Sequence, residues 1–192
     1  GLKASNFTAY DHNVKVKSIT VKQFAAQQDR MQIVVVNDRS LKMKRYNREL
    51  KELTKIFLKN LSSSDKVKVI NFNNGFTELR PFSNEELTTT EAIVNDNYAE
   101  ASEAGAALRK GIDDSFSNDH KSRVLLITNG DLDETSFAPF GLEGIMSYAK
   151  NNDIPVYVLC FGNGNRIHDL KMLAEKTGGA FIFATGSNDV YR

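Results

Sequence analysis

The sequence predicts an α/β fold: a doubly wound, mainly parallel sheet with one short antiparallel edge strand and helices on both faces. Three observations predict it. Short apolar segments alternate with stretches in which apolar residues recur every three or four positions, a pattern typical of alternating strands and helices. The short segments are apolar throughout, as expected of strands covered on both faces. One pair of strands is separated only by Asn-Asn-Gly, which favours a hairpin and hence one antiparallel strand.

The predicted elements follow one another regularly after a separate N-terminal segment. Residues 1–28 contain two strand-like stretches around a polar turn, so we expect a strand pair or extension there, followed by one domain over 29–192. Residues 76–82 follow the Asn-Gly turn and are the expected edge strand, where Pro81 is tolerable. Parallel strands are expected at 32–36, 66–72, 123–128, 154–161 and 180–184. Helices are expected around 43–61, 84–93, 98–112, 142–149 and 167–177.

Composition and charge argue against several classes of function. The net charge of +1 on 192 residues gives no bulk attraction for nucleic acid or an anionic membrane. No apolar run approaches the roughly 20 residues that span a bilayer. We therefore expect no nucleic-acid partner and no membrane insertion by this domain. The single cysteine, Cys160, excludes an internal disulfide and is expected to be a small core residue of a buried strand.

The loops that follow the parallel strands are where a doubly wound sheet binds ligands. The loop NDRSLK places Asp38 and Ser40 one residue apart, so their side chains can converge on one point; alternatively, either residue caps the helix that begins near Leu41. The loop NGDLDE is acidic without the spacing of an EF-hand, which favours a solvated loop. The loop GNGNR lacks the full spacing of a dinucleotide site. No nucleophile, base and oxyanion site assemble in the sequence, so we do not expect an enzyme.

The order of these segments resembles the von Willebrand factor type A domain over roughly residues 30–190. DRSLKM stands where the family has Asp-x-Ser-x-Ser-Met, SEAGAALRKGI where it has a threonine followed by a helix with Ala-Leu, and LLITNG where it has Leu-Thr-Asp-Gly. The ending, IPVYVLCFG followed by DLKMLAEKTGGAFIFA, is the most specific match. The resemblance implies a Rossmann-like fold and a role in protein–protein interaction or adhesion. Because the N-terminal segment is similar to strand pairs of some bacterial surface or exported proteins, it favours an extracellular, cell-surface or periplasmic location.

In that family the three motifs form the metal-ion-dependent adhesion site, where a carboxylate of the partner protein completes the coordination of Mg²⁺ or Mn²⁺. Carried over position by position, Asp38, Ser40 and Ser102 stand at the first aspartate, the first serine and the threonine. Lys42 and Asn129 stand at the second serine and the second aspartate. The resemblance therefore implies a degenerate metal site.

The two replacements weaken the predicted metal site. Mg²⁺ prefers hard oxygen ligands, whereas Lys42 removes a hydroxyl and adds an ammonium, and Asn129 removes a negative charge. A divalent ion about 4 Å from an ammonium is repelled by roughly 8 kcal/mol at an effective dielectric constant of about 20. We therefore expect no metal cofactor. We hypothesise that Lys42 points its ammonium at Asp38 and Ser102, in the place of the ion; alternatively, Lys42 extends into solvent.

The sequence thus favours a non-enzymatic domain for protein binding or assembly. It would bind a protein partner through loops 37–44, 95–102 and 129–137, without metal. One alternative is a metal-dependent adhesion domain that binds Mg²⁺ or Mn²⁺ with an unusual ligand set. Another is a nucleotide-binding or enzymatic doubly wound domain, which is supported only by fold analogy and by the GNGNR loop.

Overall fold

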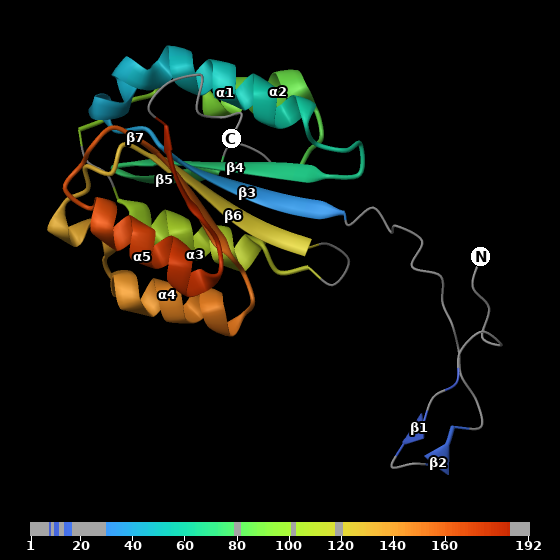
Figure 1. Cartoon of the computed structure of the whole chain (residues 1–192). Coiled ribbons are helices and arrows are strands. Elements are labelled where there is room, and N and C mark those ends of the chain that lie inside the picture. Colours follow the sequence, from blue (N-terminus) through green and yellow to red (C-terminus); the bar gives the residue numbers. More distant parts are fainter. Residues whose placement is uncertain are drawn as a thin grey trace.

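The computed structural model describes residues 8, 10–11, 14–16, 30–78, 82–100, 103–117 and 121–184 of the chain. Its main body is a six-stranded sheet with the strand order β5-β4-β3-β6-β7-β8 (Figure 1). Five strands are parallel: β3 (Met31–Asp38), β4 (Lys66–Asn73), β6 (Lys121–Thr128), β7 (Val156–Phe161) and β8 (Phe181–Ala184). β5 (Gly75–Glu78) is antiparallel to β4 and forms one edge. The predicted fold class is confirmed.

The hairpin between β4 and β5 follows from its turn residue. Gly75 has a φ of 110°, which a residue with a side chain rarely adopts, and it pairs with Asn73 in the register of the two strands. β5 is shorter than the expected edge strand 76–82. It ends at Glu78, and residues 79–81 lie outside the described part of the chain.

Two apolar layers separate the sheet from its helices. Successive side chains of a strand point to opposite faces, so Val34 and Val36 of β3 pack into one layer and Ile33 and Val35 into the other. The first layer is covered by α3, α4 and α5, and the second by α1 and α2 (Figure 1). This double coverage explains why the strands are apolar throughout.

Four of the five predicted helices lie close to their expected positions, whereas the helix expected around 98–112 begins only at Ala104, and Tyr98 precedes it in a loop. α5 ends at Gly178, whose φ of 81° gives the left-handed conformation common after a helix. None of the described helices is long and apolar enough to cross a membrane. The bounds are η2 (Leu41–Tyr46), α1 (Asn47–Lys59), α2 (Glu86–Ile93), α3 (Ala104–Asp114), η3 (Glu134–Phe137), α4 (Gly141–Asn151) and α5 (Ile167–Thr177).

A second, two-stranded sheet precedes this body in the sequence. β1 (Tyr10–Asp11) pairs with β2 (Val14–Lys15) in an antiparallel hairpin. The expected boundary between residues 28 and 29 falls within 17–29, which lie outside the described residues.

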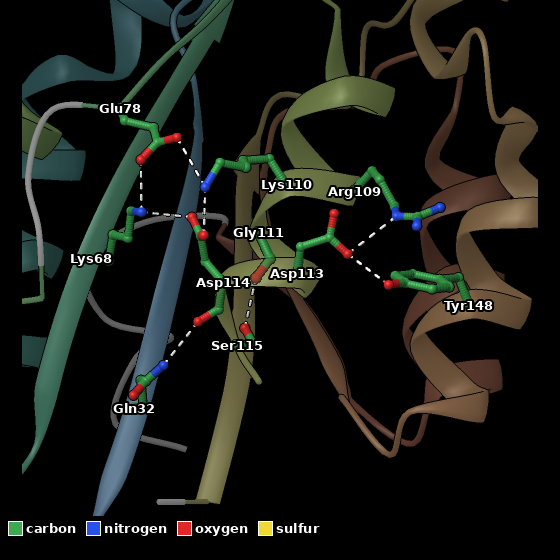
Figure 2. Close-up of polar contacts among 10 residues, drawn as sticks. All are labelled: Gln32, Lys68, Glu78, Arg109, Lys110, Gly111, Asp113, Asp114, Ser115 and Tyr148. Atoms are coloured by element: carbon green, nitrogen blue, oxygen red, sulfur yellow. Dashed lines mark hydrogen bonds and ion pairs between the residues drawn. The ribbon is translucent and has the colours of Figure 1, made fainter. Parts of the chain in front are cut away.

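Four charged side chains tie the edge strand to helix α3. Lys68 of β4 contacts Glu78 of β5 and Asp114 of α3, each at 2.7 Å, and Lys110 of α3 contacts the same two carboxylates (Figure 2). The two lysines hold the pKa of Glu78 below its usual value, Lys68 more strongly than Lys110. The cations at this end of the sheet are therefore neutralised by neighbouring acids.

Candidate functional site

The candidate site lies where the winding of the sheet reverses. The chain leaves β3 for β4 on one side, while β6 is the neighbour of β3 on the other side. β3 ends at Asp38 and β6 ends at Thr128, so the loops that follow them meet at one edge of the sheet. This is the position at which doubly wound sheets bind ligands.

Asp38 is fully buried and fixed by both neighbouring loops. Its Oδ1 accepts the backbone N–H of Ser40 at 2.8 Å, and its Oδ2 accepts the hydroxyl of Thr128 at 2.7 Å. The Thr128 hydroxyl in turn accepts the N–H of Gly130 at 3.1 Å. Asp38 therefore links the exit of β3 to the exit of β6.

Ser40 keeps a hydroxyl that is available for bonding. Ser40 is buried, and its Oγ has no hydrogen-bond partner in the part of the chain that the structure describes. It is the residue before η2, but its side chain makes no capping bond, so the interpretation of Ser40 as a side-chain cap is wrong. Ser102, the third predicted site residue, lies outside the described residues.

Lys42 does not point at Asp38. Its ammonium Nζ lies 2.5 Å from Oδ2 of Asp131, and its side chain is 64% exposed. The hypothesis that Lys42 occupies the place of the ion is therefore wrong. The alternative, that Lys42 extends into solvent, agrees with the exposure of its side chain, although the ammonium also pairs with Asp131. A lysine side chain is long and costly to bury, so Lys42 meets the carboxylate at the surface rather than the one beneath it. The pair joins loop 37–44 to loop 129–137.

The buried cation beside Asp38 is Arg39. Arg39 is fully buried; its guanidinium lies 3.9 Å from the centre of the Tyr98 ring and donates to the carbonyl of Ile93 at 3.2 Å. Burial lowers the pKa of Arg39, while Tyr98, Asp96 and Asp38 oppose the shift. Arg39 therefore anchors the segment 93–98, which leads toward Ser102.

Asn129 and the GNGNR loop have structural roles. The side-chain oxygen of Asn129 accepts the N–H of Asp131 at 2.8 Å, which fixes the turn after β6. Asn165 accepts the N–H of Leu132, and a Cβ at Gly164 would lie 2.0 Å from the carbonyl carbon of Gly130. The loop 162–166 thus packs directly against the turn after β6.

Cys160 is a buried residue of β7 beneath the candidate site. It is fully buried, as predicted, and burial followed by the charge of Asp38 raises its pKa to about 11. Its thiol is therefore neutral at physiological pH and does not supply a thiolate ligand or nucleophile.

The donor set falls short of what a divalent ion prefers. Asp38 is the one carboxylate carried over, the Ser40 hydroxyl is available, and the Asn129 oxygen is already engaged. Within the described residues, no three His, Cys, Asp or Glu side chains gather to hold a metal ion. Mg²⁺ sites use several hard oxygens in octahedral geometry, so these residues fit the ion poorly.

Four residues of the site could not be assigned a role from the sequence motifs. Thr128 closes an apolar strand, yet it is the partner of Asp38. Asp131 belongs to a run of acids that suggests only solvation, yet it holds Lys42. Arg39 and Tyr98 lie 59 positions apart, and nothing in the sequence signals that they stack. The alternation of strands gives one usable signal, because the last residues of β3 and of its neighbour β6 must lie close together.

Comparison with known proteins gives consistent matches. The family model described as the von Willebrand factor type A domain matches residues 32–191. Among solved structures, the protein BatB from Bacteroides thetaiotaomicron aligns with a TM-score of 0.69 and 16% identity over 83% of this chain and 93% of that chain. A von Willebrand factor type A protein from Catenulispora acidiphila aligns with a TM-score of 0.66 and 15% identity over 82% of this chain and 39% of that one.

A third similar structure comprises three N-terminal domains of the type V pili tip protein Mfa5 from Porphyromonas gingivalis. Its TM-score is 0.65 and its identity 12%, over 84% of this chain and 48% of that one. No curated protein sequence matches this chain significantly. The chain thus spans less than half the length of two of these three structures, and at these identities the likeness shows the fold.

Proposed function

The chain belongs to the von Willebrand factor type A family, and we propose that it is a non-enzymatic domain for protein binding or assembly that binds its partner without a metal ion. We place the binding surface on the face formed by loops 37–44, 95–102 and 129–137, which we call the upper face. Residues 101 and 102 of this face lie outside the described part of the chain.

The observation that carries the metal-free proposal is the Lys42–Asp131 pair. In a metal-dependent site a bound cation joins the loops and attracts the partner's carboxylate. Here an ammonium of the chain itself joins loop 37–44 to loop 129–137, at 2.5 Å from Asp131. The Asn129 oxygen is meanwhile turned to the N–H of Asp131. The loops are held by protein groups, which leaves a surface that a partner can contact without an ion.

Two further features support a protein partner. Leu41 is 47% exposed on the upper face, where its apolar side chain can be buried by a partner. The similar structures include a type V pili tip protein and the PilB minor pilin from Streptococcus sanguinis, both named for protein assemblies. The partner's identity does not follow from these features.

A thermal-shift series tests the proposal. We expect the Tm of the protein to change by less than about 1 °C with Mg²⁺, Mn²⁺ or a nucleotide, because a ligand that binds the folded state in excess of its Kd raises Tm. Capture of a partner from a cell extract in EDTA should be reduced by Leu41→Asp. Ile182→Asp, on the exposed side of edge strand β8, is the matched control. Stabilisation by a nucleotide, or capture that requires Mg²⁺, would contradict the proposal.

A second candidate function is metal-dependent adhesion with an unusual ligand set. The available hydroxyl of Ser40, buried beside the carboxylate of Asp38, is the observation that favours it. The same series decides between the two, because a rise of Tm with Mg²⁺ or Mn²⁺ that EDTA reverses supports the second.

A further inference from the structure

Helix α1 and the turn before it carry a local excess of positive charge. Residues 42–59 contain seven Lys or Arg and two Glu, a net charge of +5, whereas the whole chain carries +1, so the other residues carry −4. Arg48, Lys51, Lys55 and Lys59 follow at intervals of three or four, which places them on one stripe of α1, and Lys44 precedes them by one turn. All five are exposed. We call these five residues the basic ridge.

Among the described residues, the cations of the ridge have almost no acidic partners. Arg48 has one long contact, 3.9 Å, with its neighbour Glu49. By contrast, Lys68 of β4 and Lys110 of α3 each contact the carboxylates of Glu78 and Asp114 (Figure 2). The cations beside β5 are therefore neutralised, whereas those of the ridge can pair with another molecule. The ridge residues that form no ion pair within the described part of the chain are Lys44, Lys51, Lys55 and Lys59.

The N-terminal part of the ridge is unfavourably placed for the helix itself. A helix is stabilised by acids near its N-terminus and by bases near its C-terminus. Here Lys44 and Arg48 stand at the beginning; the first turn of α1 holds only Glu49 as an acid, and that of η2 holds none. Like charges at positions i and i+4, as in Lys51 and Lys55, also repel one another. Lys59 in the last turn and the spacing of Glu52 from Arg48 do favour the helix. Helix stability therefore accounts for only part of the ridge.

We propose that the basic ridge binds an extended acidic segment of a partner protein. The ridge is a surface distinct from the upper face, with which it shares only Lys44. From Arg48 to Lys59 it spans about 16 Å at a rise of about 1.5 Å per residue. An extended chain covers this length with about five residues and presents side chains on one side every 6.6 Å or so, close to the spacing of about 5 Å along the ridge.

The shape of the charge pattern favours such a segment over other polyanions. α2 packs beside α1 on the same face of the sheet (Figure 1), and the acids Glu85 and Glu91 are exposed at its ends. A flat anionic membrane would bring these acids against lipid headgroups, whereas a single acidic chain can follow the ridge alone. Single-stranded nucleic acid is held by stacking on exposed aromatic rings, but Phe57 of α1 is half-buried.

The test is direct binding of a fluorescein-labelled peptide of about ten glutamates, measured by fluorescence anisotropy in about 50 mM NaCl, where charges are weakly screened. The peptide of the same length with glutamine is the ligand control. Lys51→Glu with Lys55→Glu is the ridge variant. Lys150→Glu with Lys176→Glu is the matched control, because it changes the net charge equally at exposed positions on α4 and α5. Circular dichroism checks that both variants are folded.

We expect the glutamate peptide to bind and the glutamine peptide not to bind. The Kd for the glutamate peptide should rise at least about tenfold in the ridge variant and about twofold or less in the control variant. Raising NaCl to about 300 mM should also raise the Kd of the wild-type protein about tenfold, because the Debye length then falls well below 10 Å. Equal weakening in the two variants would show attraction by net charge alone and overturn the proposal. So would absence of binding, or tighter binding to phosphatidylserine vesicles or to an oligothymidylate. None of these outcomes bears on the metal-free upper face.

Discussion

Replacing Lys42 by serine and Asn129 by aspartate in one protein is expected to create Mg²⁺ affinity. Lys42→Ser restores a hydroxyl and releases Asp131 from its ion pair. Asn129→Asp adds a carboxylate beside Asp38 and keeps an oxygen that can accept the N–H of Asp131. With the available hydroxyl of Ser40, the site then offers several hard oxygens, which is what Mg²⁺ prefers.

The expected size of the effect follows from binding linkage. Mg²⁺ at about 100 times its Kd would stabilise the folded state by about 2.7 kcal/mol, and for a chain of this length each kcal/mol corresponds to about 2–4 °C in Tm. The side chains of Lys42 and Asp131 are 64% and 36% exposed, so loss of their pair costs at most about 1 kcal/mol. Differential scanning fluorimetry should therefore show a rise in Tm of about 5–10 °C with Mg²⁺, reversed by EDTA.

Lys150→Ser with Asn151→Asp is the matched control, because it makes the same chemical changes at exposed positions near the end of α4. Its Tm should not respond to Mg²⁺. If the folded double variant at the site is equally unresponsive, then the reasoning is refuted and the loop geometry itself prevents binding. If the wild-type protein responds as strongly as the variant, then Lys42 and Asn129 do not prevent metal binding.

Three further predictions concern the interior of the site. Thr128→Val should lower the free energy of unfolding in urea by about 2 kcal/mol, because the Asp38 carboxylate loses a charge-assisted hydrogen bond; an unchanged value would contradict this role. Tyr98→Leu should lower the free energy of unfolding by about 2 kcal/mol more than Tyr98→Phe, because a phenyl ring still stacks on the buried guanidinium of Arg39. Equal losses in the two variants would refute the stacking. The native thiol of Cys160 should resist a disulfide reagent at pH 8. Its pKa is about 11 in the folded state and lower in the unfolded state. The contribution of the thiol to the free energy of unfolding should therefore be complete below pH 9 and lost as the pH rises through 11. Cys160→Ala should remove that part of the pH dependence.

The location of the candidate site could be predicted from the sequence, whereas its contacts could not. Asp38 and Thr128 end neighbouring parallel strands, and the order of apolar segments is enough to bring such ends together. The ion-pair partner of Lys42, by contrast, could not be predicted from the order of the strands. A flexible lysine can reach several carboxylates, and burial decides among them: Asp38 is fully buried, whereas Asp131 is at the surface.

Arg39 shows a second limit of sequence reasoning. A charged residue in a loop is expected to face water, yet Arg39 is fully buried. Its backbone N–H bonds to the carbonyl of Phe72, and its carbonyl accepts the N–H of Ala99, so the segment before Ser102 closes over it. The side chain then stacks on Tyr98, a contact between residues distant in the sequence.

Local sequence patterns are enough to predict the layers of this protein: apolar strands buried on both faces, helices on either side, one antiparallel edge, and the family to which they belong. These features follow from local periodicity and from the turn residues, which depend only on neighbours along the chain. Which charges meet could be seen only in the folded protein. Folding pairs Lys42 with Asp131, buries Arg39 and leaves the basic ridge of α1 exposed. Ion pairing depends on distances of a few ångströms between segments far apart in the sequence, and folding sets those distances.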